Sequence, residues 1–171
     1  NLNETAKSNI YQVEVERFIC CGKCRIKHLS FIKADPKKVD ISDAPVIVAG
    51  GKGVGFKQQF AIIEQFADLI GAAVAGSRMA VDNGCISRER QIGQSGRTVS
   101  PELLISCGIS GANAHTIGMR DAKTVIAINK DKNAPMIKMA DLGVVGDLHE
   151  IIPALNKLLL NHHNEKTELQ K

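Results

Sequence analysis

The densest group of chemically capable residues in the sequence is GISGANAH, residues 108–115. It follows the apolar run LLIS at 103–106, and it combines two glycines with a serine hydroxyl and an imidazole. Glycines let the backbone approach a ligand closely, and free N–H groups at the beginning of a helix bind phosphate oxygens. The same residues also suit a tight strand-to-helix turn in which Ser110 caps the helix and His115 is a core histidine. Both interpretations stay open on this stretch alone.

Three other glycine-containing stretches carry polar side chains. GSRMAVDNG, 76–84, places Arg78 directly after an apolar run, and QIGQSG, 91–96, has more glycines and polar groups than a simple turn needs, although a solvated hairpin loop is the alternative. GGKGVGF, 50–56, does not match a dinucleotide fingerprint, because Phe56 occupies the position of the third glycine. We interpret it as a flexible strand-to-helix loop whose Lys52 reaches a ligand.

Short apolar runs that alternate with helical segments predict the scaffold around these residues. Strands are expected at 45–51, 72–77, 102–107, 123–129 and 142–147. The clearest helix is FKQQFAIIEQFADLIGA, which has one apolar face and ends at Gly71. Further helices are expected over 111–119 and 147–160, the latter with Asp147 as its N-cap and a kink or a new start at Pro153. This alternation predicts an α/β fold, a doubly wound, mostly parallel sheet with flanking helices, whose binding site lies at the carboxyl ends of the strands.

Composition limits the classes of function. The chain has 171 residues, 44% of them hydrophobic, which suits about one domain, and no apolar run approaches the ~18 residues that cross a membrane. That lack of a long apolar run leads us to expect no membrane insertion. The net charge of +4 is mild and comes from basic residues mostly interleaved with acidic ones, so we expect no nucleic-acid binding. Five cysteines, an odd number, indicate a reducing compartment, the cytoplasm or the mitochondrial matrix of a eukaryote. The polar start without Met predicts a processed or excised piece.

The first 44 residues differ in texture from the rest. YQVEVERF, 11–18, alternates with a period of two, 25–33 is a weaker strand, and 33–43 is a polar linker. The predicted division is therefore an N-terminal strand pair and linker at 1–44, the main domain at 45–160 and a frayed tail at 161–171.

A cysteine cluster, CCGKCRIKH, lies at 20–28. Cys21 and Cys24 have C-x-x-C spacing, and Cys20 and His28 are the remaining candidates for zinc ligands, but a second well-spaced pair is missing. A thioredoxin-like redox pair needs a helix start, whereas strand patterns flank the cluster. Cysteines of an ordinary turn are favoured here, and a metal or thiol site remains the alternative.

Several motifs jointly resemble one family. SRMAVD, QIGQSG, SPELLISCGISGANAH, GMRDAKTVIAINKD, AP and ADLGVVGDLHEIIPAL occur in the order and spacing of the C-terminal, FAD-binding domain of the electron transfer flavoprotein alpha subunit. The resemblance covers residues 45 to about 158 without large gaps. The resemblance does not extend to the larger N-terminal domain of that subunit, of which we expect at most a remnant before residue 44, and the cysteine cluster lies outside the family pattern.

The resemblance implies a Rossmann-like fold, FAD as cofactor, and a role for each matching residue. Arg78, beside Ser77, lies against the flavin ring, and His115 approaches its carbonyl O2. Ser95 donates a hydrogen bond to flavin N5. The other residues implied beside the ring are Gln91, Gln94 and Gly96.

The remaining implied contacts belong to the other parts of the cofactor. Ser110 and the backbone near Gly108 and Gly111 hold the phosphates. Asn129 and Asp147 contact the AMP half, and Lys52 replaces a frequent arginine near the cofactor.

The implied function is electron transfer rather than catalysis on a substrate. Members of the family accept electrons from acyl-CoA and related dehydrogenases, as in fatty acid oxidation, pass them to a quinone reductase, and pair with a beta subunit. A guanidinium and an imidazole beside the ring stabilise the negative charge that reduction builds on its N1–C2=O2 side, while the cofactor carries the redox step. The alternatives are a non-redox module that binds NAD or AMP, and a thiol or metal module at 20–28.

Overall fold

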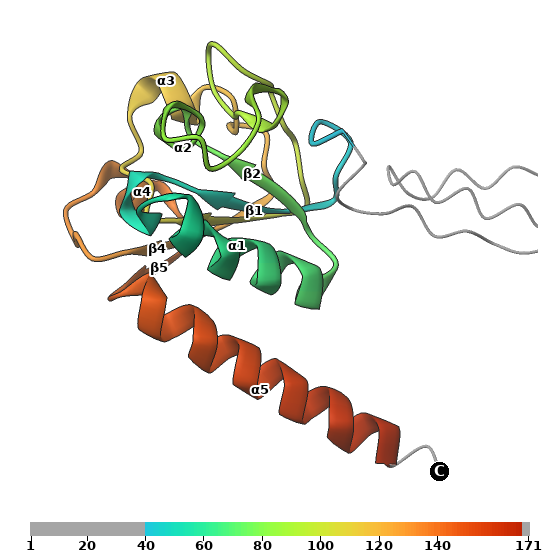
Figure 1. Cartoon of the computed structure of the whole chain (residues 1–171). Coiled ribbons are helices and arrows are strands. Elements are labelled where there is room, and N and C mark those ends of the chain that lie inside the picture. Colours follow the sequence, from blue (N-terminus) through green and yellow to red (C-terminus); the bar gives the residue numbers. More distant parts are fainter. Residues whose placement is uncertain (1–39, 169–171) are drawn as a thin grey trace, which may run out of the picture.

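Five short apolar runs form one parallel sheet in the computed structural model, which describes residues 40–168 and their side chains up to Asn161. The strands are β1 (Val46–Gly50), β2 (Ala73–Gly76), β3 (Leu103–Cys107), β4 (Thr124–Asn129) and β5 (Leu142–Val145). Their order is β2-β1-β3-β4-β5, and every neighbouring pair is parallel (Figure 1). The predicted doubly wound α/β fold is confirmed.

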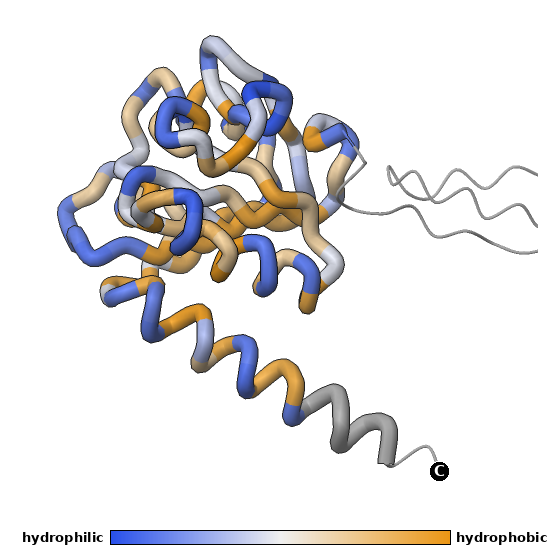
Figure 2. The backbone as a smooth tube through the Cα atoms, viewed as in Figure 1, coloured by the Kyte–Doolittle hydropathy of each residue, from blue (hydrophilic) through white to orange (hydrophobic). Residues whose placement is uncertain are grey.

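Apolar and polar residues do not alternate along the inner strands, because both faces of the sheet are covered. In β1, Ile47 pairs with Leu104 of β3 and Val48 pairs with Ile105, and all four side chains are buried, on alternating faces. Strand β5 is different: it is an edge strand, and Leu142 and Val145 are more than half exposed. Figure 2 shows the hydrophobic residues concentrated along the strands.

One face of the sheet is covered by the two long helices, α1 (Lys57–Ile70) and α5 (Leu148–Glu168). Phe60 and Ile63 of α1 and Leu148 and Ile152 of α5 are buried in the same core. Helix α1 ends where predicted, because Gly71 adopts the left-handed conformation with φ 68° that a C-terminal cap requires.

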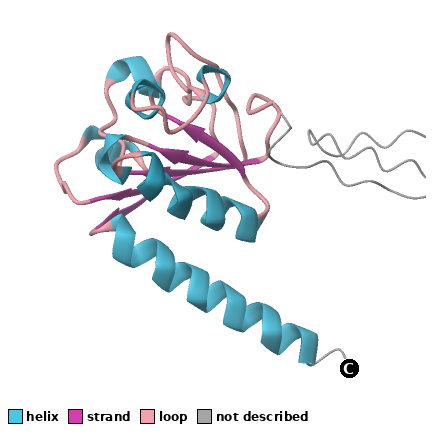
Figure 3. Cartoon of the chain, in the orientation of Figure 1, coloured by secondary structure: helices cyan, strands magenta, loops and turns pink. Residues whose placement is uncertain are grey.

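The other face is covered by α4 (Pro135–Met139) and by loops. Met136, Ile92 and Met119 are buried there. The remaining elements are short: α2 (Arg78–Asp82), α3 (Asn113–Thr116) and the 3-10 turns η1 (Lys52–Val54) and η2 (Arg88–Arg90). Figure 3 shows that most of the loops gather at one end of the sheet, where the strands finish.

Two predicted helices have different bounds in the structure. The helix expected over 111–119 is only Asn113–Thr116, because Gly111, with φ 86°, keeps the preceding backbone non-helical. Helix α5, expected to end at 160, continues through Pro153 to Glu168, so the part of the tail expected to be frayed is helical up to that residue.

The beginning of the described segment also belongs to the core. Ile41 and Ala44, predicted to be linker, are buried against Ile47 and Leu104 of the sheet. The predicted strands at 11–18 and 25–33 and the cysteine cluster at 20–28 lie outside the described residues. Within the described part of the chain, no helix combines the length and the apolar character needed to cross a membrane.

Candidate functional site

The main cavity lies where the strand order reverses. Strands β1 and β3 are neighbours, but the chain leaves β1 toward β2 and leaves β3 toward β4, so the loops at their carboxyl ends separate. A cavity of about 730 Å³ occupies this place. Most of the predicted site residues line it, namely Lys52, Ser77, Arg78, Gln91, Gln94, Ser95, Gly108, Ser110, His115 and Asn129.

The floor of the cavity is backbone. The Gly51 N–H donates to the carbonyl of Cys107 and the Gly53 N–H donates to that of Gly108, both over 2.9 Å. A Cβ atom on Gly53 would lie 2.8 Å from Gly108 Cα, so the two loops approach too closely for a side chain. The glycine stretch at 50–56 connects β1 to α1, as predicted, but it is a hydrogen-bonded turn rather than the flexible loop expected from sequence.

The loop after β3 presents free N–H groups. Its carbonyls at Gly108, Ile109 and Ser110 accept hydrogen bonds from Gly53 N, Asn129 Nδ2 and Met136 N. In the described part of the chain, the amides of 109–112 have no hydrogen-bond acceptor. The sequence assigned this property to a helix N-terminus, but α3 has only four residues and starts later, so the donors belong to the loop itself.

His115 lines this site and has one unpaired nitrogen. Its Nδ1 lies 3.1 Å from the carbonyl oxygen of Ile92, and only 7% of the residue is exposed. Its Nε2 is buried and has no hydrogen-bond partner among the described residues. Burial lowers the pKa of the ring, and the hydrogen bond to Ile92 opposes that shift only in part. The neutral ring then donates from Nδ1 and presents the Nε2 lone pair, which a satisfied core histidine does not do.

The segment 91–97 forms one wall, and it is buried at 91–93 and exposed at 94–97, so only its second half fits the solvated loop that was the alternative. Gln91 and Ile92 are buried, and Gln91 forms a bridge with Gly76 at the end of β2. The side chain of Gln91 donates from Nε2 to Ser95 Oγ over 2.8 Å. Gln94 N–H donates to the carbonyl of Ala114, beside His115, over 2.7 Å. The hydroxyl and the imidazole are thus held by the same segment.

Two cationic side chains line the cavity. Arg78 begins α2, and its Nε lies 3.6 Å from the carboxylate of Asp82; both side chains are more than half exposed, so this ion pair restrains the guanidinium weakly. Lys52 lies in η1 and is exposed. Both are long and accessible enough to contact an anionic ligand.

Three of the predicted residues do not line the cavity. Asp147 is an N-cap, as predicted: its carboxylate accepts the His149 N–H over 3.0 Å and lies 2.9 Å from Lys130 Nζ. These two hydrogen bonds, chiefly that with Lys130, lower the pKa of Asp147. Gly96 and Gly111 act on packing instead, since a Cβ on either would meet the backbone of Gln91 or of Met136.

The sequence also missed part of the lining. The missed residues follow the carboxyl ends of strands or flank predicted residues, and this position in the sequence could have identified them. They are Gly53, Met79, Ile92, Ile109, Ala112, Ala114, Asp131, Ala134 and Pro135. Asp131 is placed by Asn129, whose Oδ1 accepts the Asp131 N–H over 3.0 Å.

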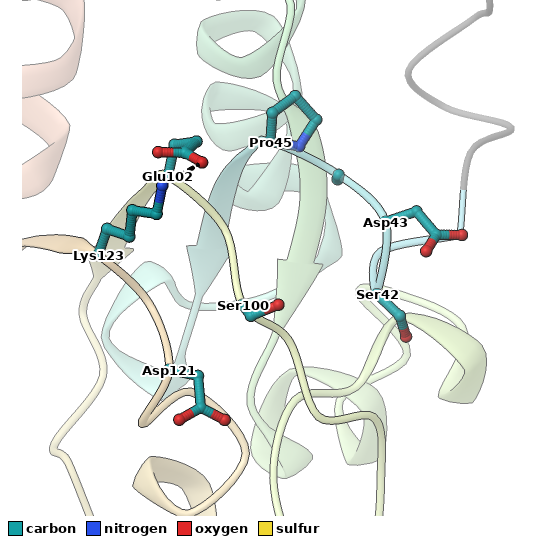
Figure 4. Close-up of a pocket in the computed structure, with 8 residues that line it drawn as sticks. Ser42, Asp43, Pro45, Ser100, Glu102, Asp121 and Lys123 are labelled. Atoms are coloured by element: carbon teal, nitrogen blue, oxygen red, sulfur yellow. Dashed lines mark hydrogen bonds and ion pairs between the residues drawn. The ribbon is translucent and has the colours of Figure 1, made fainter. Parts of the chain in front are cut away.

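A second cavity, of about 440 Å³, lies at the opposite end of the sheet (Figure 4). It is lined by the carboxylates of Asp43, Glu102 and Asp121, and Lys123 Nζ lies 2.7 Å from Glu102. It contains none of the predicted site residues. Among the described residues, no group of His, Cys, Asp and Glu side chains is arranged to hold a metal ion.

The main cavity fits a ligand that combines phosphates with a polar ring. Free loop amides and two cations suit phosphate oxygens, a backbone floor allows close approach, and the unpaired Nε2 of His115 and the hydroxyl of Ser95 suit ring heteroatoms. FAD has both parts.

Comparison with known proteins identifies the family. Residues 40–120 match the family described as "Electron transfer flavoprotein FAD-binding domain". The chain belongs to the electron transfer flavoprotein alpha family. It is 48% identical to an electron transfer flavoprotein subunit alpha of Paracoccus denitrificans over 71% of this chain and 40% of that protein. It is 47% identical to Protein FixB of Clostridium saccharobutylicum over 88% of this chain and 44% of that protein.

The predicted family and the predicted cofactor are both confirmed at this level, since the matching family is an FAD-binding domain. A mycobacterial alpha subunit, from Mycobacterium leprae, is 52% identical over 68% of the chain and 36% of its own length. The chain thus spans less than half the length of these electron transfer flavoprotein relatives.

Proposed function

We propose that this chain is the FAD-holding part of an electron transfer flavoprotein, and that the flavin ring lies in the main cavity between Arg78, Ser95 and His115. The observation that carries the proposal is that His115, whose buried Nε2 has no partner among the described residues, lines the same cavity as a hydroxyl and two cations. A buried polar atom without a partner is costly, and a ring with hydrogen-bonding edges would satisfy it.

Bound FAD would supply one- and two-electron redox chemistry, and the residues of the chain would set its electrostatic environment. Arg78 brings positive charge that favours added electrons. Neutral His115 presents a lone pair at Nε2, so it must take up a proton there before it can donate to a negatively charged oxygen. Burial lowers the pKa of this ring, and negative charge developing beside it would favour uptake of that proton.

The phosphates and the AMP half would extend along the loops after β1, β3 and β4. The N–H groups of 109–112, the Ser110 hydroxyl and Lys52 are the proposed phosphate ligands. Asn129 and the neighbouring Asp131 are proposed to contact the AMP half. The earlier assignment of Asp147 to the AMP half is weakened, because its carboxylate is occupied by Lys130 and by the cap of α5.

The proposed partners are those of the family: a beta subunit, acyl-CoA or related dehydrogenases as donors, and a quinone reductase as acceptor, in the cytoplasm or the mitochondrial matrix. Exposed apolar side chains at the same end of the sheet, Phe56 before α1 and Met79 in α2, support a protein partner at the cavity mouth. The proposed function involves neither binding to nucleic acid nor insertion into a membrane.

The test is FAD retention by the chain together with its beta subunit, measured by equilibrium dialysis and flavin absorbance. Wild type is expected to retain FAD. Arg78→Ala is expected to change the reduction potential of the bound flavin, whereas Arg120→Ala, an exposed arginine outside the cavity, is the matched control. Failure to retain FAD, with NAD or AMP bound instead, would favour the non-redox nucleotide module.

A further inference from the structure

Gln91 is a buried polar residue whose backbone is fixed at the end of β2. Only 4% of it is exposed. Its N–H donates to the carbonyl of Arg88 over 3.2 Å, and its carbonyl accepts the Arg97 N–H over 2.7 Å. The next residue, Ile92, donates to the carbonyl of Gly76 over 2.9 Å. The starting point of the Gln91 side chain is therefore set by the sheet.

The chain then turns back so that Ser95 meets this side chain. Gly96 makes the turn possible, since a Cβ there would collide with the Gln91 carbonyl. Gln91 Nε2 lies 2.8 Å from Ser95 Oγ, which is short for an N–H···O hydrogen bond. Among the described residues, the Ser95 side chain has no other hydrogen-bond partner. Both residues line the main cavity.

The type of this hydrogen bond decides where the hydroxyl proton goes. A side-chain amide N–H can only donate, and a serine hydroxyl has one proton and two lone pairs. The bond from Gln91 uses a lone pair of Ser95 and leaves the proton free. We propose that Gln91 is a positioning residue, which keeps the Ser95 hydroxyl proton directed into the cavity, toward a hydrogen-bond acceptor on the ring of the cofactor. This inference rests on the proposed function.

A carboxylate in the same place would act in the opposite way. Glutamate has nearly the size and shape of glutamine, but its ionised oxygens only accept hydrogen bonds. In Gln91→Glu, the Ser95 proton would turn to the carboxylate, and a lone pair would face the cavity. A glutamine with its amide reversed would already hold Ser95 in that way, so Gln91→Glu distinguishes the two amide orientations.

The first experiment needs no cofactor. In the NMR spectrum of the full chain, Ser95→Ala is expected to shift the side-chain amide resonances of Gln91 and to speed the hydrogen exchange of one of its two protons. Unchanged Gln91 resonances would overturn the inference, because the bond on which it depends would not exist in solution.

The second experiment uses the complex of the chain with its beta subunit and FAD. Gln91→Glu is expected to weaken FAD binding at least tenfold. Gln65→Glu, the same substitution on the exposed side of α1, is the control and should leave the affinity within twofold of wild type. Wild-type affinity in Gln91→Glu would overturn the proposal, since the amide oxygen would then face Ser95.

A double-mutant cycle separates positioning from a merely structural role. Neutral Gln91→Met is expected to shift the flavin reduction potential, and this shift should fall by half or more in the Ser95→Ala background, because both changes remove one donor. Equal shifts in both backgrounds would show that Gln91 acts independently of Ser95 and would sink the idea. If wild type itself retains no FAD, the proposed function falls and the positioning role falls with it, whereas the NMR result still decides whether the bond exists.

Discussion

The interlocked glycines under the cavity allow a quantitative prediction with a built-in comparison. Gly53 has an ordinary φ, but its Cβ would lie 2.8 Å from Gly108 Cα. Gly84 has φ 67° with nothing within 4 Å of a Cβ, so only its backbone conformation resists substitution. Gly108 combines both constraints, with φ 63° and a Cβ 2.8 Å from the Gly53 backbone. The three alanine substitutions therefore isolate close approach, conformation and their sum.

The expected losses follow from these constraints. An alanine in the left-handed region costs about 1–2 kcal/mol, less about 0.4–1 kcal/mol recovered by restricting the unfolded chain. Forcing a methyl group into a packed site costs about 1–3 kcal/mol. The free energy of unfolding should thus fall by about 0.5–1 kcal/mol in Gly84→Ala, by about 1–2 kcal/mol in Gly53→Ala and by about 2–4 kcal/mol in Gly108→Ala.

The assay is urea denaturation followed by circular dichroism, with FAD affinity measured in parallel. Gly53→Ala and Gly108→Ala should also weaken FAD binding about tenfold or more, because the displaced backbone is the cavity floor, while Gly84→Ala should leave the affinity unchanged. Equal stability of Gly84→Ala and Gly108→Ala, or a Gly53→Ala variant as stable as wild type, would refute the close approach.

Three further predictions concern ionisable side chains. Arg78→Ala should shift the reduction potential of bound FAD more than His115→Ala does, measured by redox titration; a larger effect of His115 would reverse this ranking. Burial lowers the pKa of His115 from 6.5, so the folded chain resists a proton that the unfolded chain binds, and the free energy of unfolding should fall as the pH drops below about 6.5. His115→Asn should flatten that part of the pH profile; an identical profile would contradict a buried neutral ring. Hydrogen bonds, first from Lys130 and then from the His149 amide, lower the pKa of Asp147 from 3.8, so its contribution to stability is full above that pH and is lost as the pH falls through the lowered value. Asp147→Ala should therefore lower the melting temperature at pH 7 and speed amide exchange at the start of α5, with the difference in melting temperature shrinking in acid; an undiminished difference at low pH would mean that the carboxylate charge is irrelevant.

The sequence predicted the sheet because buried parallel strands have a local signature. VIVAG and LLISC are largely apolar runs, each followed by a glycine, and each forms a strand near its expected bounds. The Gly71 cap was predictable for the same reason, since the signal lies within one turn of the helix it ends. Features that depend on residues distant in sequence were harder. No residue near Gly53 in the sequence indicates that Gly108 lies against it. Because of this contact, the loop expected to be flexible is held in place.

In the candidate site, too, local features were predictable from sequence and contacts between distant residues were not. Motif resemblance found Arg78, Ser95 and His115, but their partners depend on how the loops fold together. The unpaired Nε2 of His115 exists because Nδ1 is held by a carbonyl in another loop, and the position of Ser95 depends on Gln91. Asp147 shows the opposite case: its capping role was local and predictable, and its ion pair with Lys130 was not.

Because the base of the cavity is main chain locked to main chain, evolution has little freedom to reshape it by exchanging amino acids there. Changes in ligand preference are therefore expected at cavity-lining side chains outside the glycine floor, such as those of Lys52, Arg78, Gln94 and Asp131. These side chains can change without disturbing the joined loops. To make the protein bind an altered cofactor, these four positions should be randomised and the glycines of the floor kept.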